Sequence, residues 1–159
     1  MEKGMIQVYY GSGQGKSAAA LGNAMRIASQ GLKTIIIQFL KSEINSDYFE
    51  KLEPEIKFFR FERSKEGFQN LSDEQKEEEK INILNGLNYA KKVLGTGECD
   101  LLVLDEILGV VDEGIIPEDD ILEVLEGRSI NTNVILTGTS ITPGIFEIAD
   151  NVLNLQPEK

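Results

Sequence analysis

The chain has 159 residues, of which 41% are hydrophobic, and 16 Lys and Arg against 27 Asp and Glu give a net charge of -11. This length suits one domain, residues 1–159, that buries roughly two thirds of its unfolded surface. Such an acidic chain is not expected to bind nucleic acid, because Lys and Arg contacts to phosphates supply most of that affinity.

The charge is unevenly distributed along the chain. Residues 1–97 contain 14 Lys and Arg against 13 Asp and Glu, whereas residues 98–159 contain 2 against 14. Capacity to bind an anion therefore lies in the first part.

The single cysteine, Cys99, cannot form an intrachain disulfide, so we expect a buried core thiol and a cytoplasmic protein. No apolar run approaches the roughly 20 residues that cross a bilayer, so no membrane association is expected.

The first predicted strand, 5–10, leads into the loop Gly-Ser-Gly-Gln-Gly-Lys-Ser at residues 11–17. A glycine-rich turn between a buried strand and a helix presents backbone N–H groups to phosphate. Lys16 would reach phosphate oxygens, and the Ser17 hydroxyl would bind Mg²⁺. The usual spacing of this motif would place a glycine at Tyr10, so the loop is shorter than the common form.

Helical periodicity and apolar runs alternate over the rest of the chain, the pattern of an α/β fold with a parallel sheet. Helix 17–30 is rich in small residues and ends at Gly31. Beyond the second and third strands, the charged stretch 62–72 contains one aromatic side chain, Phe68, which we expect to be exposed on a mobile loop. The predicted strands are 5–10, 34–39, 56–61, 100–104, 133–137 and 151–155, and shorter helices are predicted at 118–126 and 143–150.

The longest predicted helix begins at a capping box formed by Ser72 and Gln75 and runs to about Leu94. Its glutamate-rich first turns should be a solvated face rather than a metal site. The predicted apolar stripe of this helix contains Ile81, Leu84, Leu87, Ala90 and Leu94.

The fourth strand is followed by two carboxylates, Asp105 and Glu106. Ligands of open parallel sheets bind just outside the carboxyl ends of the strands. Asp105 and Glu106 could hold Mg²⁺ there, directly or through water, and Mg²⁺ together with Lys16 would neutralise a polyphosphate.

These motifs resemble the P-loop type of ATP:corrinoid adenosyltransferase, and the resemblance extends over nearly the whole chain. It implies a three-layer, P-loop NTPase-like fold with a mostly parallel central sheet. The short, glycine-alternating loop is itself a mark of that family. The stretches that carry the resemblance are "VYYGSGQGKSAAALGNAMRIASQGLKTIIIQFLK", "LEPEIKFFRF", "GF", "DLLVLDE", "VILTG" and "EIADNVLNL".

The resemblance implies that a cobalt(I) corrinoid attacks the 5′ carbon of ATP and expels the whole triphosphate. ATP would lie reversed in the loop, so that the loop holds the leaving group. Gln38 and Lys41 would border the nucleotide, Ser17 and Glu106 would serve Mg²⁺, and Phe68 would meet the corrinoid. An electron-donor protein and a homodimer are further implied. The phosphate-binding residues would be Gly11, Ser12, Gly13, Gln14, Gly15, Lys16 and Ser17.

Other features of the sequence depart from the family pattern and leave two alternatives open. Family members usually carry Asn and Lys at the positions of Ser12 and Gln14, Thr at that of Ala18 and Arg at that of Thr139. The family's N-terminal segment and C-terminal tail are also expected to be absent. One alternative is therefore a weakly active paralogue that binds nucleotide or corrinoid. The other is an ordinary P-loop NTPase, which the short loop disfavours.

Overall fold

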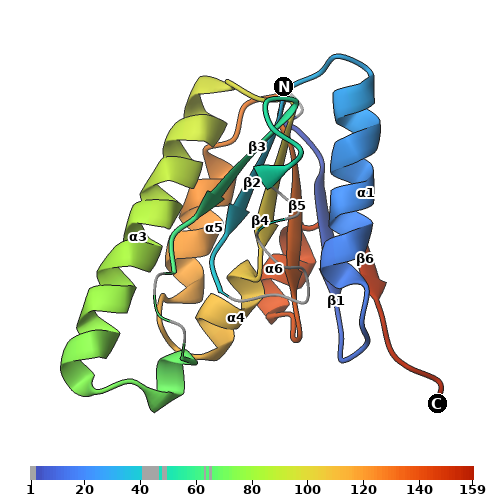
Figure 1. Ribbon diagram of the computed structural model, residues 1–159. Helices are drawn as coiled ribbons and strands as arrows, with labels where there is room; N and C mark the ends of the chain where they lie inside the picture. The colour runs from blue at the N-terminus through green and yellow to red at the C-terminus, as the bar shows by residue number, and fades with distance from the viewer. Residues whose placement is uncertain (1–2, 41–46, 48–49, 63, 65) are drawn as a thin grey trace.

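The computed structural model describes residues 3–40, 47, 50–62, 64 and 66–159, and contains a six-stranded sheet in the order β3-β2-β4-β5-β1-β6 (Figure 1). Every pair of neighbouring strands is parallel, which confirms the predicted α/β class. All six predicted strands are present within two residues of the expected ends. They are β1 (Ile6–Tyr10), β2 (Thr34–Gln38), β3 (Ile56–Arg60), β4 (Leu101–Asp105), β5 (Asn133–Gly138) and β6 (Asn151–Asn154).

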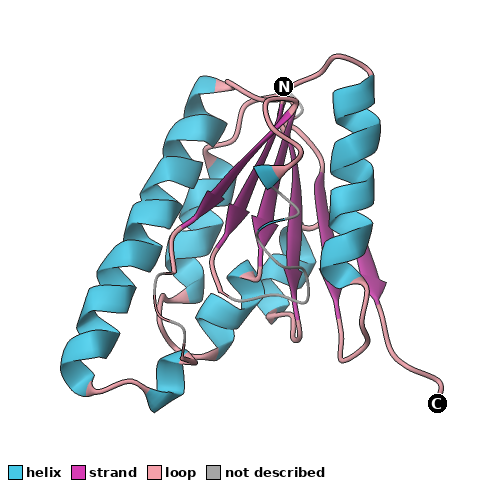
Figure 2. Cartoon of the chain, in the orientation of Figure 1, coloured by secondary structure: helices cyan, strands magenta, loops and turns pink. Residues whose placement is uncertain are grey.

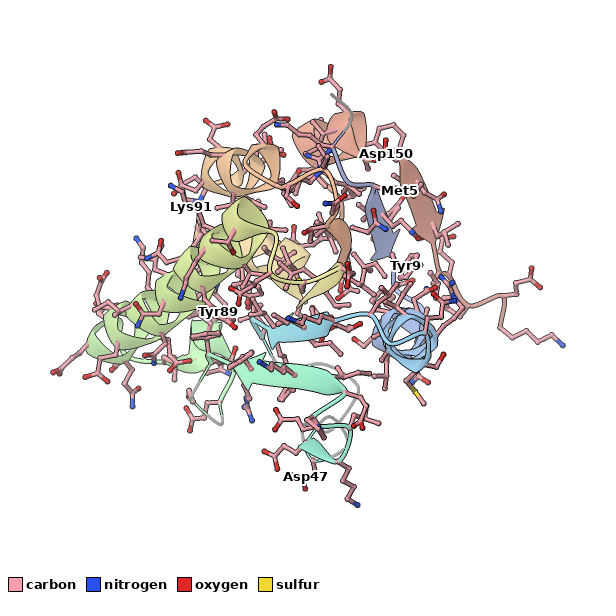
Figure 3. The ribbon with its side chains drawn as sticks, turned by 90° about the horizontal axis from the view of Figure 1, so that it is seen from above. Met5, Tyr9, Asp47, Tyr89, Lys91 and Asp150 are labelled. Atoms are coloured by element: carbon pink, nitrogen blue, oxygen red, sulfur yellow. The ribbon has the colours of Figure 1, made fainter. Side chains whose placement is uncertain are left out.

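Helices cover both faces of the sheet and make the three layers that the sequence predicts (Figure 3). One face packs on α1 (Lys16–Ser29), and the other on α3 (Asp73–Thr96), α4 (Ile107–Asp112), α5 (Glu118–Glu126) and α6 (Pro143–Ile148). The strand residues alternate between the two cores, because successive side chains of a strand point to opposite faces. Ile36 packs with Ala20 and Ala24 of α1, whereas Ile35 and Ile37 pack in the opposite core.

Helix α3 begins with the predicted capping box. The backbone amide of Gln75 donates to Ser72 Oγ at 3.2 Å, and the backbone amide of Ser72 donates to the side-chain oxygen Oε1 of Gln75 at 3.0 Å. The predicted apolar stripe is wrong in its first member, because Ile81 is 58% exposed while Ile83 is fully buried. Glu79, expected on a solvated face, is also buried and accepts a hydrogen bond from Asn82.

The orientation of α3 follows from close contacts at Gly86. A Cβ atom added there would lie 2.9 Å from a ring carbon of Phe61 and 3.2 Å from one of Phe39. The glycine lets the helix approach these rings, and the tertiary contact selects which face of α3 is buried. Local periodicity alone does not contain this information.

The helix α4 and the 3₁₀ turn η1 (Phe68–Asn70) were not predicted. Phe68 opens this turn, is half-buried and packs against the main core, so the expectation of an exposed aromatic is wrong. Of the described helices, none has the length and apolar character required to span a membrane.

Cys99 lies in the core, where burial raises the pKa of its thiol to about 12. This agrees with the predicted buried thiol.

The carboxyl ends of the strands meet at one edge of the sheet, the lower edge in Figure 2, together with the loop between β1 and α1. The parallel register sets Gln38 opposite Asp105 and Tyr10 opposite Gly138. The register therefore brings four strand ends, far apart in the sequence, to a common place.

Candidate functional site

The loop from Gly11 to Ser17 connects β1 to α1 at this edge. Gly15 has φ 102° and directly precedes the helix, a conformation that a residue with a Cβ atom rarely adopts. The loop thereby turns its backbone at the amino terminus of α1, where unpaired N–H groups and the helix dipole favour an anion.

Lys16 lies folded over the loop. Its side chain is 7% exposed, and Nζ donates to the carbonyl oxygens of Gly11 and Gly13, both at 2.8 Å. An ammonium group has three N–H donors, so a further donor can reach an anion beside the loop. Lys16 thus holds the loop together and places its positive charge beside Gly11 and Gly13.

Ser17 and Asp105 meet in a buried hydrogen-bond network. Asp105 is 1% exposed, and its Oδ1 accepts hydroxyl hydrogen bonds from Ser17 and Thr137, each at 2.8 Å. The side-chain amide nitrogen Nε2 of Gln38 donates to Oδ2 of Asp105 at 3.4 Å. Hydroxyl and carboxylate oxygens are the donor set that Mg²⁺ prefers, so this part of the site suits that ion chemically.

Asp105 and Glu106, predicted as a carboxylate pair, go to different places. Glu106 takes the left-handed backbone conformation with φ 62°, and its amide donates to Thr137 Oγ1 at 2.8 Å. Among the described residues, no group of three or more His, Cys, Asp or Glu side chains is arranged to hold a metal. Asp105 therefore belongs to the buried network through its side chain, whereas Glu106 is held through its backbone bond to Thr137.

Leu155, which directly follows β6, fixes the loop from the side. Its amide donates to the Tyr10 carbonyl at 2.7 Å, and its carbonyl accepts the Gly13 amide at 2.8 Å. A Cβ atom would lie 2.3 Å from the Leu155 oxygen if placed at Gly11 and 2.8 Å if placed at Gly13. These two glycines are thus required by the neighbouring backbone, a role that sequence reasoning missed because the contact spans the whole chain.

A cavity of about 310 Å³ opens beside the network. It brings together Phe68 and Glu106, two of the predicted site residues, and Thr139. Glu113 also lines the cavity, and the pKa of its carboxyl group is raised, mainly by burial and to a smaller extent by the neighbouring Asp112 charge. The described lining residues are Leu40, Glu62, Gly67, Phe68, Glu106, Gly109, Asp112, Glu113 and Thr139.

Of the other predicted site residues, Ser12 and Gln14 are exposed on the loop, whereas Lys41 lies outside the described residues. A larger cavity, of about 530 Å³, lies beside the start of α3 and is lined by none of the predicted site residues. Of these two cavities, the smaller one is linked to the loop, because its lining residue Thr139 accepts the Gly11 amide at its carbonyl oxygen, at 3.1 Å.

The family model for ATP:corrinoid adenosyltransferase BtuR/CobO/CobP matches residues 2–159. The chain belongs to this family. It is 30% identical to the corrinoid adenosyltransferase of Escherichia coli K12 over 99% of the chain and 79% of that protein. It is 28% identical to that of Pseudomonas aeruginosa over 97% of the chain and 75% of that protein.

Solved structures support the P-loop type of fold. A KaiC-like protein of Pyrococcus horikoshii matches 99% of the chain and 75% of its own length, with a TM-score of 0.61 and 20% identity. The cytoplasmic domain of EssC matches 95% of the chain and 30% of its own length, with a TM-score of 0.56 and 19% identity. At these identities the likeness concerns the fold alone.

Proposed function

We propose that this family member transfers the 5′-deoxyadenosyl group of ATP to a cobalt(I) corrinoid and releases tripolyphosphate. One structural observation supports the proposal in addition to family membership. The Gly11 amide donates to the carbonyl oxygens of Gly138 and Thr139, at 3.2 and 3.1 Å, and Thr139 also lines the cavity of Phe68 and Glu106. The loop that would bind the triphosphate and the cavity that would face the corrinoid thus adjoin at one strand end, which supports a reaction between two substrates.

The phosphate side of the site suits a triphosphate. The loop residues Gly11 to Ser17 would surround it, and Lys16 would donate to its oxygens. Mg²⁺, when bound, would neutralise part of the phosphate charge. Because the Ser17 hydroxyl hydrogen is directed at Asp105, the Ser17 oxygen keeps lone pairs for a cation. Asp105 would therefore act through Ser17, while Glu106 would serve the ion from the cavity side.

The cavity side would receive the corrinoid, with Phe68 against it and Gln38 and Lys41 near the nucleotide. Cobalt(I) is itself the nucleophile, so no side chain has to attack. A cobalt–carbon bond forms, the bond between C5′ and the triphosphate oxygen breaks, and the triphosphate leaves with the bonding electron pair. The protein contributes orientation and stabilises the charge of the leaving group.

A weakly active, nucleotide-binding paralogue is the second candidate. Ser12, Gln14 and Thr139 are exposed neutral side chains beside the loop or cavity, where the family pattern described above has Asn, Lys and Arg. The lower positive charge would bind the triphosphate less firmly. An electron-donor protein, a homodimeric assembly and a cytoplasmic location remain part of the proposal for either candidate.

The deciding experiment is an anaerobic assay with ATP, Mg²⁺ and chemically reduced cobalamin. We expect the cobalt(I) absorption to disappear with time as adenosylcobalamin forms, and only when ATP is present. Nucleotide binding by calorimetry without any adenosylcobalamin would support the paralogue. Loss of the cobalt(I) spectrum in the absence of ATP would report oxidation rather than transfer.

A further inference from the structure

Thr137, in β5, lies between the two carboxylate residues of the site. Its hydroxyl donates to Asp105 Oδ1 at 2.8 Å, and the same oxygen accepts the Glu106 amide at 2.8 Å. The side chain is fully buried, so it cannot touch a substrate. Thr137 is one of the polar groups that the motifs of the loop and the fourth strand did not predict.

The bond to Glu106 stabilises an unfavourable backbone conformation. At φ 62° the Cβ atom of a residue such as Glu106 crowds its own carbonyl, and such conformations persist only where the surroundings fix them. This turn sends the chain into α4 immediately after β4. As a result Asp105 joins the buried network, while Glu106 lines the cavity.

The bond to Asp105 completes a continuous chain of donors. The Glu106 amide donates to Thr137, and both Thr137 and Ser17 donate to the same oxygen of Asp105. A fully connected buried network of this kind is rigid and has a single arrangement. Without the Thr137 hydroxyl, the Glu106 amide and one acceptor site of Asp105 would each lose a partner.

We propose that Thr137 is a positioning residue, which fixes Asp105 and Glu106 relative to each other and so keeps the phosphate side and the cavity side of the site in one geometry. The inference rests on the proposed function, since it assigns Ser17 and Glu106 to Mg²⁺ and Glu106 to the cavity that receives the corrinoid.

Thr132 provides a matched control. It is also fully buried, and its hydroxyl donates to the Cys99 carbonyl at 2.8 Å, but it lies before β5, at the opposite edge of the sheet. Replacing either threonine by valine removes a bonded hydroxyl at nearly constant volume. If the Thr137 hydroxyl only stabilises the fold, both variants should lower the melting temperature, and they should not differ in kcat/KM or in the Mg²⁺ dependence of ATP binding.

The experiment compares Thr137→Val, Thr137→Ser and Thr132→Val in the full chain. Melting temperature, MgATP affinity at a series of Mg²⁺ concentrations, and kcat and KM for cob(I)alamin are measured for each. We expect Thr137→Val to lower kcat/KM about 10- to 100-fold, the scale of a hydrogen bond to a charged group, and to require more Mg²⁺ for ATP binding. Thr137→Ser should restore both to within about threefold, while Thr132→Val should lower only the melting temperature.

Equal Mg²⁺ dependence and equal kcat/KM in Thr137→Val and Thr132→Val would overturn the proposal, as would a failure of Thr137→Ser to restore them. If Thr137→Val does not fold, Thr137→Ala, which needs less room, takes its place against Thr137→Ser. A parent protein that binds MgATP but transfers no adenosyl group would refute the proposed function. The Mg²⁺ dependence of ATP binding would still decide the role of Thr137.

Discussion

The phosphate side and the cavity side of the site differ in how their side chains are held. On the phosphate side, Ser17, Asp105 and Thr137 are at most 2% exposed and are bonded to one another. On the cavity side, Phe68 is half-buried in a turn of three residues, and Glu106 precedes a helix of six. Buried hydrogen bonds therefore fix the side chains proposed for the phosphate side, whereas short elements shape the cavity. Substitutions on the two sides should have separable effects.

The largest separable effect is expected on the phosphate side from Lys16→Ala. Removing the ammonium group should weaken MgATP binding by about 2 to 3 kcal/mol, the scale of a charged hydrogen bond, without preventing folding. Calorimetry with MgATP measures this loss. Lys80→Ala, an exposed lysine on α3, is the control and should bind like the parent protein. Equal affinity in Lys16→Ala and the parent would remove Lys16 from the site.

Two glycine substitutions test whether the Leu155 carbonyl fixes the loop. Gly13→Ala would bring a methyl group against the Leu155 carbonyl and should lower the free energy of unfolding by about 1 to 3 kcal/mol. Gly22→Ala, in the interior of α1 with open space around it, should raise it by about 1 kcal/mol. Urea unfolding measures both. A stabilising Gly13→Ala would show that Leu155 does not fix the loop.

On the cavity side, Phe68→Ala should weaken corrinoid binding by about 1 kcal/mol, or roughly fivefold, the scale of an aromatic contact. The affinity for MgATP should stay unchanged, because Phe68 lies outside the Asp105 network. Phe146→Ala, on α6 and 57% exposed, is the matched control. The measurement is KM for cob(I)alamin beside calorimetry with MgATP. Parallel losses of both affinities would mean that the two sides are not separate.

The smallest effect is expected from adding charge beside the loop. Gln14→Lys and Thr139→Arg should each strengthen triphosphate binding by about 0.5 kcal/mol at low salt, because exposed charges are strongly screened. The gain should shrink as salt is added, which calorimetry at two ionic strengths will show. No gain from either variant, alone or combined, would place the phosphates elsewhere.

The contrast between the two sides also explains what could be predicted from the sequence. The strands and the capping box depend on local patterns and are predicted correctly. The same holds for the place of the loop between β1 and α1, while its binding of phosphate stays a prediction. The roles of Leu155 and Thr137 depend on contacts between segments far apart in the chain, which one sequence does not reveal. Helix α4 was missed because its short apolar run, directly after β4, has no cap signal, and its preceding residue, Glu106, adopts a conformation unusual for glutamate.

In the proposed reaction the triphosphate is released from ATP as one intact group while the adenosyl group moves to cobalt. Phosphorus NMR of an anaerobic reaction with ATP, Mg²⁺ and cob(I)alamin tests it most directly, since tripolyphosphate, ADP and orthophosphate have distinct spectra. We predict tripolyphosphate in amounts equal to the adenosylcobalamin formed, negligible ADP, and no phosphate product without corrinoid. ADP and orthophosphate formed from ATP in the absence of corrinoid would refute the proposed adenosyl transfer and indicate an ordinary NTPase.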